Sequence, residues 1–367
     1  MSRNPLVVLG ELGQSPWYDF ITRDLVTGGE LDRLITEDGL KGMTSNPTIF
    51  QKAVASSSLY DQDIRNLTGM SLQPRDIFES LAVTDVQSAC DAFSPVYERS
   101  GGVDGLVSLE VDPTLARDTA GSITEARRLW AAVNRPNAMI KIPGTVEGLP
   151  AITRCLADGI NINVTLLFSV ARYEQVIDAF LKGLEERAAK GQPVDHLASV
   201  ASFFVSRVDG KVDATIDAKG GLDALRGTAA IANACAAYSA FEKSLAGPRW
   251  QALAGKGAKV QRPLWASTST KDPKYPDVYY IEALIAEHTV NTIPPATFEA
   301  YKDHGKPVIR IREGMAKAPA QLAALQNAGI NLDEVTKTLE VEGVASFAKS
   351  YAELLAVIEH KAGALVG

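Results

Sequence analysis

The sequence is poor in the residues that build disulfide scaffolds and metal sites. Its three cysteines, Cys90, Cys155 and Cys235, are far apart and have no metal-ligand spacing. We expect them to be buried, small apolar side chains in a reducing compartment. The four histidines form no H-x-x-x-H pair, which argues against a helical zinc site. We therefore expect no metal ion.

Long apolar segments and glycine-rich phosphate loops are also missing. No apolar run is long enough to span a bilayer, and the N-terminal "MSRNPLVVLGELG" lacks the core of a signal peptide, so we expect a cytoplasmic protein that binds no membrane. Neither G-x-G-x-x-G nor G-x-x-x-x-G-K-[ST] occurs. A net charge of -7 argues against a nucleic-acid partner, which would need a basic face. A phosphorylated metabolite stays possible, because a few local cations suffice to bind one.

What the sequence does contain is a regular alternation of β-prone runs and segments of helical period. The 367 residues are 46% hydrophobic, enough for a large core. We expect eight strands, at 16–20, 40–46, 105–111, 138–143, 159–168, 197–205, 262–268 and 290–295. Eight strand–helix repeats predict an α/β fold of the (β/α)8 TIM barrel type. The alternative is an open doubly wound sheet, which more often has a glycine-rich loop after its first strand.

The domain organisation follows from segment lengths. Residues 51–100 and 209–260 are each longer than one helix, so we expect helical insertions there. No low-complexity linker divides the chain. We expect a single barrel domain over residues 1–367.

One strand contains an unusual charge. Lys141 lies in the apolar run "AMIKIPGT", where a buried ammonium would be costly. One interpretation is that Lys141 ends a strand and reaches water. The other is that it is desolvated, and desolvation lowers the pKa of a lysine and makes its amine nucleophilic.

Polar residues recur at the ends of the other predicted strands, where barrels of this kind place their active sites. The set is Asp19, Asn46, Glu110, Asn163, Thr165, Ser202 and Arg207. Taken singly, each has a structural explanation such as a helix cap, a turn or a surface ion pair. Together they suit Schiff-base chemistry: an amine attacks a ketone, carboxylates such as Asp19 and Glu110 move protons, amides hold hydroxyls, and Ser202 with Arg207 holds a phosphate.

The order of five motifs supports this interpretation. "GMTSNPTIF", "SLEVDP", "MIKIPGT", "GININVTLLFS" and "FFVSRVD" resemble the transaldolases of the pentose phosphate pathway, and most closely their longer bacterial subgroup. The resemblance runs from Trp17 to the "NTIPPAT" segment. It implies a class I transferase without cofactor or metal. Such an enzyme moves a dihydroxyacetone unit reversibly from sedoheptulose 7-phosphate to glyceraldehyde 3-phosphate, giving erythrose 4-phosphate and fructose 6-phosphate.

The resemblance also implies roles for individual residues. Lys141 corresponds to the Schiff-base lysine, and Asp19 to the aspartate that handles the proton of C3–C4 cleavage. Glu110 and Thr165 correspond to the pair that positions the catalytic water. Asn46 and Asn163 correspond to the asparagines that hold the dihydroxyacetone hydroxyls. Ser202 and Arg207 correspond to the phosphate-binding pair.

Two features bear on the subclass. The related fructose 6-phosphate aldolases generally have Gln and Tyr where this chain has Glu110 and Phe204, and the residues present here favour transfer over release of dihydroxyacetone. Many transaldolases offer a second phosphate-binding arginine after the seventh strand. This chain reads "WASTSTKDPKY" there, so Ser269 or Lys271 would have to replace it.

The rival interpretations are a lysine aldolase that cleaves without transfer, a catalytically inactive barrel that binds sugar phosphates, and a barrel isomerase. The isomerase would use a carboxylate or histidine base without a covalent intermediate. We expect phosphorylated ketose and aldose substrates, and a monomer or homodimer.

Overall fold

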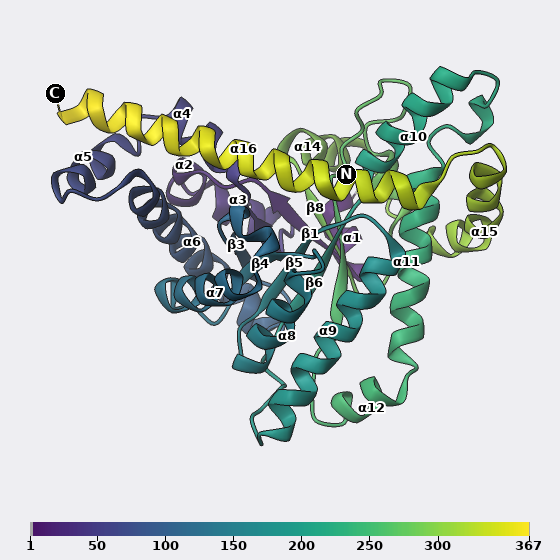
Figure 1. The fold of residues 1–367 in the computed structure, drawn as a ribbon, viewed down its shortest axis with the longest axis horizontal. Coiled ribbons are helices and arrows are strands. Elements are labelled where there is room, and N and C mark those ends of the chain that lie inside the picture. The colour runs from purple at the N-terminus through teal and green to yellow at the C-terminus, as the bar shows by residue number, and fades with distance from the viewer. Residues whose placement is uncertain (1–2, 367) are drawn as a thin grey trace.

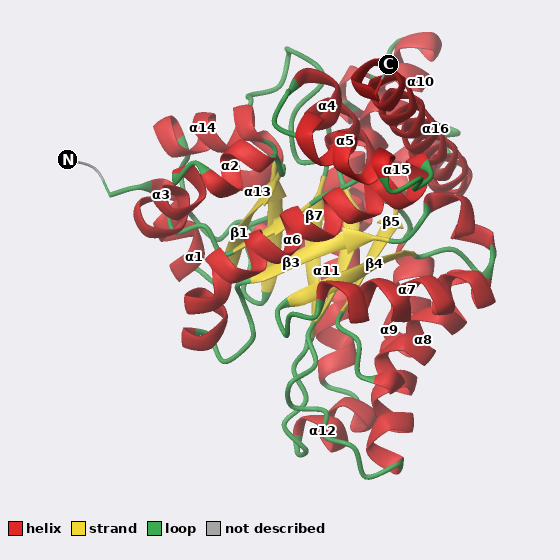
Figure 2. Ribbon diagram, turned by 90° about the vertical axis from the view of Figure 1, so that its left-hand side faces the viewer, coloured by secondary structure: helices red, strands yellow, loops and turns green. Residues whose placement is uncertain are grey.

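The computed structural model of the chain describes residues 3–366 and contains a closed barrel of eight parallel strands in sequence order. Figure 2 shows the strands in yellow, with helices packed around them. Each strand pairs with the next, and β8 closes the barrel on β1. The predicted (β/α)8 fold is confirmed. The strands are β1 (Gln14–Asp19), β2 (Gly42–Thr44), β3 (Leu106–Glu110), β4 (Ala138–Pro143), β5 (Ile162–Leu167), β6 (Ser199–Phe204), β7 (Gln261–Ala266) and β8 (Thr289–Ile293).

Helices surround the barrel and follow every strand (Figure 1). The first half contains α1 (Pro5–Glu11), α2 (Arg23–Thr27), α3 (Glu30–Glu37), α4 (Pro47–Ser56), α5 (Asp61–Gly69), α6 (Pro74–Arg99), the 3-10 helix η1 (Pro113–Arg117), α7 (Thr119–Val133) and α8 (Gly148–Asp158). The second half contains α9 (Val170–Ala189), α10 (Ser206–Lys219), η2 (Asp223–Leu225), α11 (Ala229–Leu245), α12 (Pro248–Ala254), α13 (Tyr279–Ala283), α14 (Pro295–His304), α15 (Ile311–Asn327) and α16 (Leu332–Val366). Within the described residues, no helix is both long and apolar enough to cross a membrane.

All eight predicted strands form, but six are shorter than expected, and the ranges 40–46 and 159–168 lose the most residues. The predicted strand 40–46 narrows to β2 because Asn46 leaves the sheet to cap α4, accepting a hydrogen bond from the Ile49 amide at 3.0 Å. The predicted strand 159–168 begins later because Gly159, at a φ of +94°, ends α8 in the left-handed conformation. Helix capping therefore sets both boundaries.

The barrel interior is filled rather than hollow. Trp17 of β1 is fully buried, and its indole lies where a Cβ at position 42 would come within 2.5 Å of it, so β2 needs Gly42. At the N-terminal end of the barrel, the buried Arg262 guanidinium donates to Ser15 Oγ at 2.8 Å and to Asp104 Oδ1 at 3.0 Å. The three cysteines are buried and free, as expected.

The long C-terminal helix α16 crosses the C-terminal end of the barrel (the yellow helix in Figure 1). It packs on α4, α5 and α6, which lie between β2 and β3, and on α10, which follows β6. Its aromatic residues Phe347 and Tyr351 are buried. This helix therefore covers the end of the barrel where the strand-end polar residues lie.

Candidate active site

A cavity of about 300 Å³ opens at the C-terminal ends of the strands. It is lined from β1 to β8 by residues that include most of those predicted from the sequence. The lining set contains Asp19, Asn46, Lys141, Thr165, Ser202, Phe204, Arg207, Ser269 and Lys271. Residues more than 250 positions apart in the sequence thus meet in one cavity because parallel strands all end at the same face of the barrel.

Lys141 is buried, with 5% of its surface exposed. Its Nζ donates to the Ser45 carbonyl at 2.9 Å and lies 3.1 Å from Glu110 Oε2. The register pairs Glu110 directly with Lys141 across β3 and β4, so both side chains point into the barrel. The interpretation of Lys141 as a strand-end lysine reaching water is therefore wrong.

The two carboxylates of the site are desolvated. Burial is the main cause that raises the pKa of Glu110, while the nearby Lys141 ammonium opposes the shift. Burial likewise raises the pKa of Asp19, and Lys141 and the Thr44 hydroxyl, which donates to Asp19 Oδ1 at 2.8 Å, oppose it. Both groups are thus suited to exchange protons nearer neutral pH than ordinary carboxylates do.

Thr165 is presented by an irregularity of β5. The strand register shifts between Val164 and Leu167, and Leu166 has a φ of +60°, which is strained for a leucine. Thr165 is fully buried, and its hydroxyl has no hydrogen-bond partner among the residues described. A buried hydroxyl without a partner is available to a water molecule or a ligand.

The two asparagines differ in position. Asn46 caps α4 with its Oδ1 and also lines the cavity. Asn163 is fully buried, where its Nδ2 donates to Ser108 Oγ at 3.0 Å and its Oδ1 accepts from Ser202 Oγ at 2.7 Å. Asn163 therefore connects the floor of the site to Ser202, which itself lines the cavity.

Arg207 supplies a cation to the opposite side of the cavity. Its guanidinium lies 5.2 Å from the centroid of the Phe204 ring, and no carboxylate of residues 3–366 pairs with it. Burial lowers the pKa of Arg207, and the Asp19 charge opposes that shift. On the loop after β7, Lys271 Nζ donates to Ser269 Oγ at 2.9 Å. The cavity thus contains cations that an anionic group of a ligand would pair with.

Sequence analysis missed several lining residues. Phe347, on α16, lies with its ring centroid 6.0 Å from Lys141 Nζ. It could not be found from the strand-end pattern, because it lies on the last helix, beyond the last strand. Thr44, whose hydroxyl donates to Asp19, lies within the motif "GMTSNPTIF", two positions before Asn46. Lys52, one turn and a half into α4, also lines the cavity.

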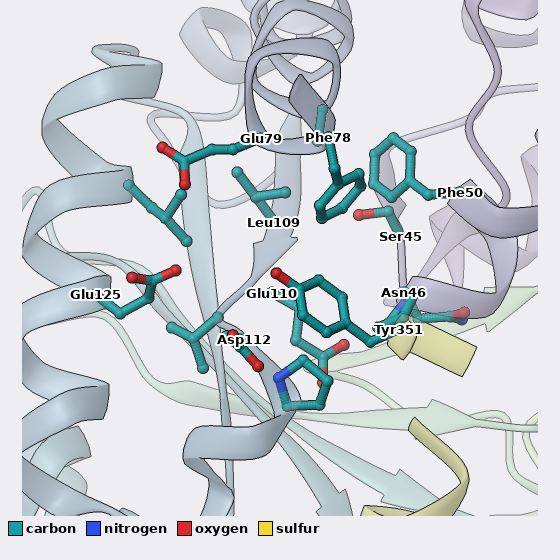
Figure 3. Close-up of a pocket in the computed structure, with 15 residues that line it drawn as sticks. Ser45, Asn46, Phe50, Phe78, Glu79, Leu109, Glu110, Asp112, Glu125 and Tyr351 are labelled. Atoms are coloured by element: carbon teal, nitrogen blue, oxygen red, sulfur yellow. The ribbon is translucent and has the colours of Figure 1, made fainter. Parts of the chain in front are cut away.

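A second, smaller cavity of about 30 Å³ lies between β3 and the helices α4, α6, α7 and α16 (Figure 3). Glu110 and Asn46 line it together with Tyr351 and a set of acidic residues, Glu79, Asp112 and Glu125. Arg75 pairs with Glu125 at 3.3 Å and with Asp112 at 3.5 Å. Glu110 therefore borders this small cavity, while Lys141 borders the main one.

The comparisons with known proteins agree with this geometry. The family model described as Transaldolase/Fructose-6-phosphate aldolase matches residues 16–358. The chain belongs to this family. It is 50% identical to the transaldolase of Frankia alni, over 98% of each chain. It is 52% identical to that of Acidothermus cellulolyticus, over 97% of this chain and 96% of the relative, and 49% identical to that of Thermobifida fusca, over 96% of each.

Family membership agrees with the position of the buried lysine. The five motifs that carried the resemblance lie at the C-terminal ends of β2, β3, β4, β5 and β6. Lys141 lies at their centre, beside one carboxylate and beneath one aromatic ring. The resemblance seen in the sequence is thus confirmed for the family and for the fold.

Proposed function

We propose that the chain is a transaldolase that forms a Schiff base on Lys141. The observation that carries the proposal is the buried Lys141 Nζ, 3.1 Å from Glu110 Oε2, in a cavity that also contains Asp19 and Arg207. Its substrates are phosphorylated ketoses and aldoses, and the reaction transfers a dihydroxyacetone unit from sedoheptulose 7-phosphate to glyceraldehyde 3-phosphate.

In the first half of the reaction, the neutral Lys141 amine attacks the C2 carbonyl of the ketose. The carbinolamine loses water to give an iminium ion, and Glu110 with Thr165 positions the water that leaves and later returns. Asp19 accepts the proton of the C4 hydroxyl as the C3–C4 bond breaks, and the electron pair of that bond neutralises the iminium to an enamine. An aldose phosphate then leaves.

In the second half, the enamine carbon attacks the aldehyde of the acceptor, and Asp19 returns its proton to the new C4 hydroxyl. Water then hydrolyses the iminium and frees Lys141. Asn46 and Asn163 hold the hydroxyls of the dihydroxyacetone unit, while Ser202 and Arg207 hold the phosphate. Phe347 and α16 limit access of bulk water, which would otherwise release the dihydroxyacetone before transfer.

Borohydride reduction in the presence of fructose 6-phosphate tests the proposal. Peptide mass mapping should find a dihydroxyacetone-derived adduct on Lys141. Absence of an adduct on any lysine, in folded protein with saturating sugar, would rule out the Schiff base and favour a binding protein.

The second candidate is a fructose 6-phosphate aldolase, because the matching family model includes both activities. Glu110 and Phe204 favour transfer. The two activities are separated by product analysis with and without an aldehyde acceptor. A transaldolase should release little dihydroxyacetone without an acceptor, whereas an aldolase should release it in either case.

A further inference from the structure

Two elements bring cations to the same side of the cavity without being adjacent in sequence. Arg207 is the second residue of α10, and Lys271 lies on the loop that follows β7. Between β6 and β7 themselves, backbone pairing runs up to Phe204 and Ala266, and just beyond the strand ends Ser206 Oγ lies 2.9 Å from Ser267 Oγ. Beyond the strand ends, the spacing of the two cations depends on what joins α10 to the β7 loop.

Asp209 makes the first connection. It follows Arg207 by two positions and is buried, with 1% of its surface exposed. Its Oδ1 accepts from the Ala230 amide at 2.7 Å, at the start of α11, and its Oδ2 accepts from the Tyr280 hydroxyl at 2.9 Å. Tyr280 belongs to α13, which continues the β7 loop.

Asp213, one helical turn further along α10, makes the second connection. It is 6% exposed. Its Oδ2 accepts from the Tyr275 hydroxyl at 2.5 Å, and its Oδ1 accepts from the Gly227 amide at 3.2 Å. Asp209 and Asp213 lie on one face of α10, because residues four apart in a helix share a face. Two tyrosines of the β7 segment thus dock on two carboxylates of the helix that presents Arg207.

Further contacts make the β7 segment rigid behind these hydrogen bonds. The rings of Tyr275 and Tyr279 stack with centroids 5.5 Å apart and an interplanar angle of 18°. The Tyr279 hydroxyl donates to the Gly227 carbonyl at 3.1 Å. Arg226 pairs with Asp272, the residue next to Lys271, at 2.9 Å. These contacts hold the loop on the C-terminal side of Lys271, and on its N-terminal side Thr268 Oγ1 donates to Asn291 Oδ1 at 2.8 Å.

Two buried carboxylates are a costly way to join a helix to a loop. Burying an ionised group costs free energy that only good hydrogen-bond geometry offsets, and an apolar contact would join the same elements at lower cost. What the polar contact adds is geometric precision, because each bond fixes a direction as well as a distance. Precision matters where two cations must fit one phosphate.

We propose that Asp209, Asp213, Tyr275 and Tyr280 are positioning residues that set the spacing of Arg207 and Lys271, and so set the affinity for the phosphate of the acceptor. The inference rests on the proposed function, since it assigns these cations to a phosphorylated substrate. The four residues form a tyrosine–aspartate network on the side of α10 away from the cavity. They contact no reacting atom.

The substitutions Tyr275→Phe and Tyr280→Phe test the network, since each removes one hydroxyl and keeps the ring. We expect KM for glyceraldehyde 3-phosphate to rise about two- to tenfold in each, the equivalent of one hydrogen bond. With unphosphorylated glyceraldehyde as the acceptor, neither KM nor kcat should change. Asp213→Asn, which keeps the size of the side chain, should behave like Tyr275→Phe.

Tyr238→Phe is the matched control. Tyr238 is also a buried tyrosine, but its hydroxyl donates to the Glu287 carbonyl at 3.0 Å, outside the network. This variant should leave both KM values unchanged. The proposal would be overturned if KM changed equally for the phosphorylated and the unphosphorylated acceptor, or if Tyr238→Phe changed KM to the same extent. The network would then have only a structural role.

Phosphate binding separates failure of this inference from failure of the proposed function. Even if the wild-type chain transfers nothing to either acceptor, calorimetric titration can measure the affinity of the wild-type chain and its variants for inorganic phosphate. Weaker binding in Tyr275→Phe than in Tyr238→Phe would support the network without transaldolase activity. Equal binding in both variants, or no binding to the wild-type chain, would refute it.

Discussion

Lys141 Nζ and Glu110 Oε2 lie 3.1 Å apart on paired positions of neighbouring strands, both nearly closed to solvent. A buried pair of this kind cannot lose one partner without leaving the other charge uncompensated. The two side chains are thus held together by the barrel register itself.

Lys141→Ala should abolish turnover while the chain stays folded. The barrel is closed by backbone pairing on both sides of β4, so removing one side chain leaves the register intact. Lys141→Arg is the control, because it keeps a cation beside Glu110 but supplies no nucleophile. Both variants should lack activity and show wild-type circular dichroism. An unfolded Lys141→Ala together with an active Lys141→Arg would assign the lysine a structural role.

Glu110→Gln should lower kcat by about 10²–10⁴-fold, the usual contribution of a general acid–base group. KM should change little, since Glu110 lies beside Lys141 rather than at the phosphate side of the cavity. Stopped-flow trapping should show slower iminium formation and hydrolysis. An unchanged kcat would mean that another group moves these protons.

The acid limb of the kcat/KM profile should lie above the ordinary range of aspartate, which is near pH 4. Burial raises the pKa of Asp19, and cleavage needs its ionised form, so activity should fall as pH drops through this raised pKa. Thr44→Val removes the hydroxyl that stabilises the charged form. This variant should move the acid limb of the kcat/KM profile to still higher pH. An acid limb that moves to lower pH, or does not move, would show that Asp19 is not the group that titrates.

Asp209→Asn should make stability less dependent on pH. Burial raises the pKa of Asp209 from 3.8 to about 6. Because the folded state holds this proton more tightly than the unfolded state, ionisation destabilises the fold as pH rises from 3.8 to 6, by about 3 kcal/mol if all else is constant. Denaturant unfolding at pH 4 and pH 7 should show the variant gaining stability relative to wild type at the higher pH. A constant difference between the two pH values would contradict the shift.

Asp104→Ala should reduce the free energy of unfolding by about 3–5 kcal/mol, because it leaves the Arg262 guanidinium buried without its carboxylate. Transferase activity per folded molecule should not change, since this pair lies at the end of the barrel remote from the cavity. Asp158→Ala, which breaks a more exposed pair with Arg127 on α7, should cost less than about 1 kcal/mol. A similar decrease in the free energy of unfolding in the two variants would show that burial of the ion pair does not determine how much its loss destabilises the fold.

Sequence reasoning located the strands and their reactive ends because these depend on local pattern. Lys141 and Glu110 were identifiable as polar residues in apolar runs that alternate with helices. Phe347 was not, because a phenylalanine in a long helix looks the same whether it packs on a neighbouring helix or over an active site. The tyrosine–aspartate network was missed for a related reason. Asp209 and Tyr280 are 71 positions apart, and nothing local indicates that they meet.

The eight strand–helix repeats, the family motifs and the position of Lys141 in an apolar run are all readable from the sequence, because hydrophobic periodicity and motif order are properties of neighbouring residues. The burial of Lys141 and the groups that surround it come from the folded chain. Barrel closure brings β3 beside β4, and α16 places Phe347 over the amine from the far end of the chain. Such contacts depend on packing between distant segments, which no short stretch of sequence specifies.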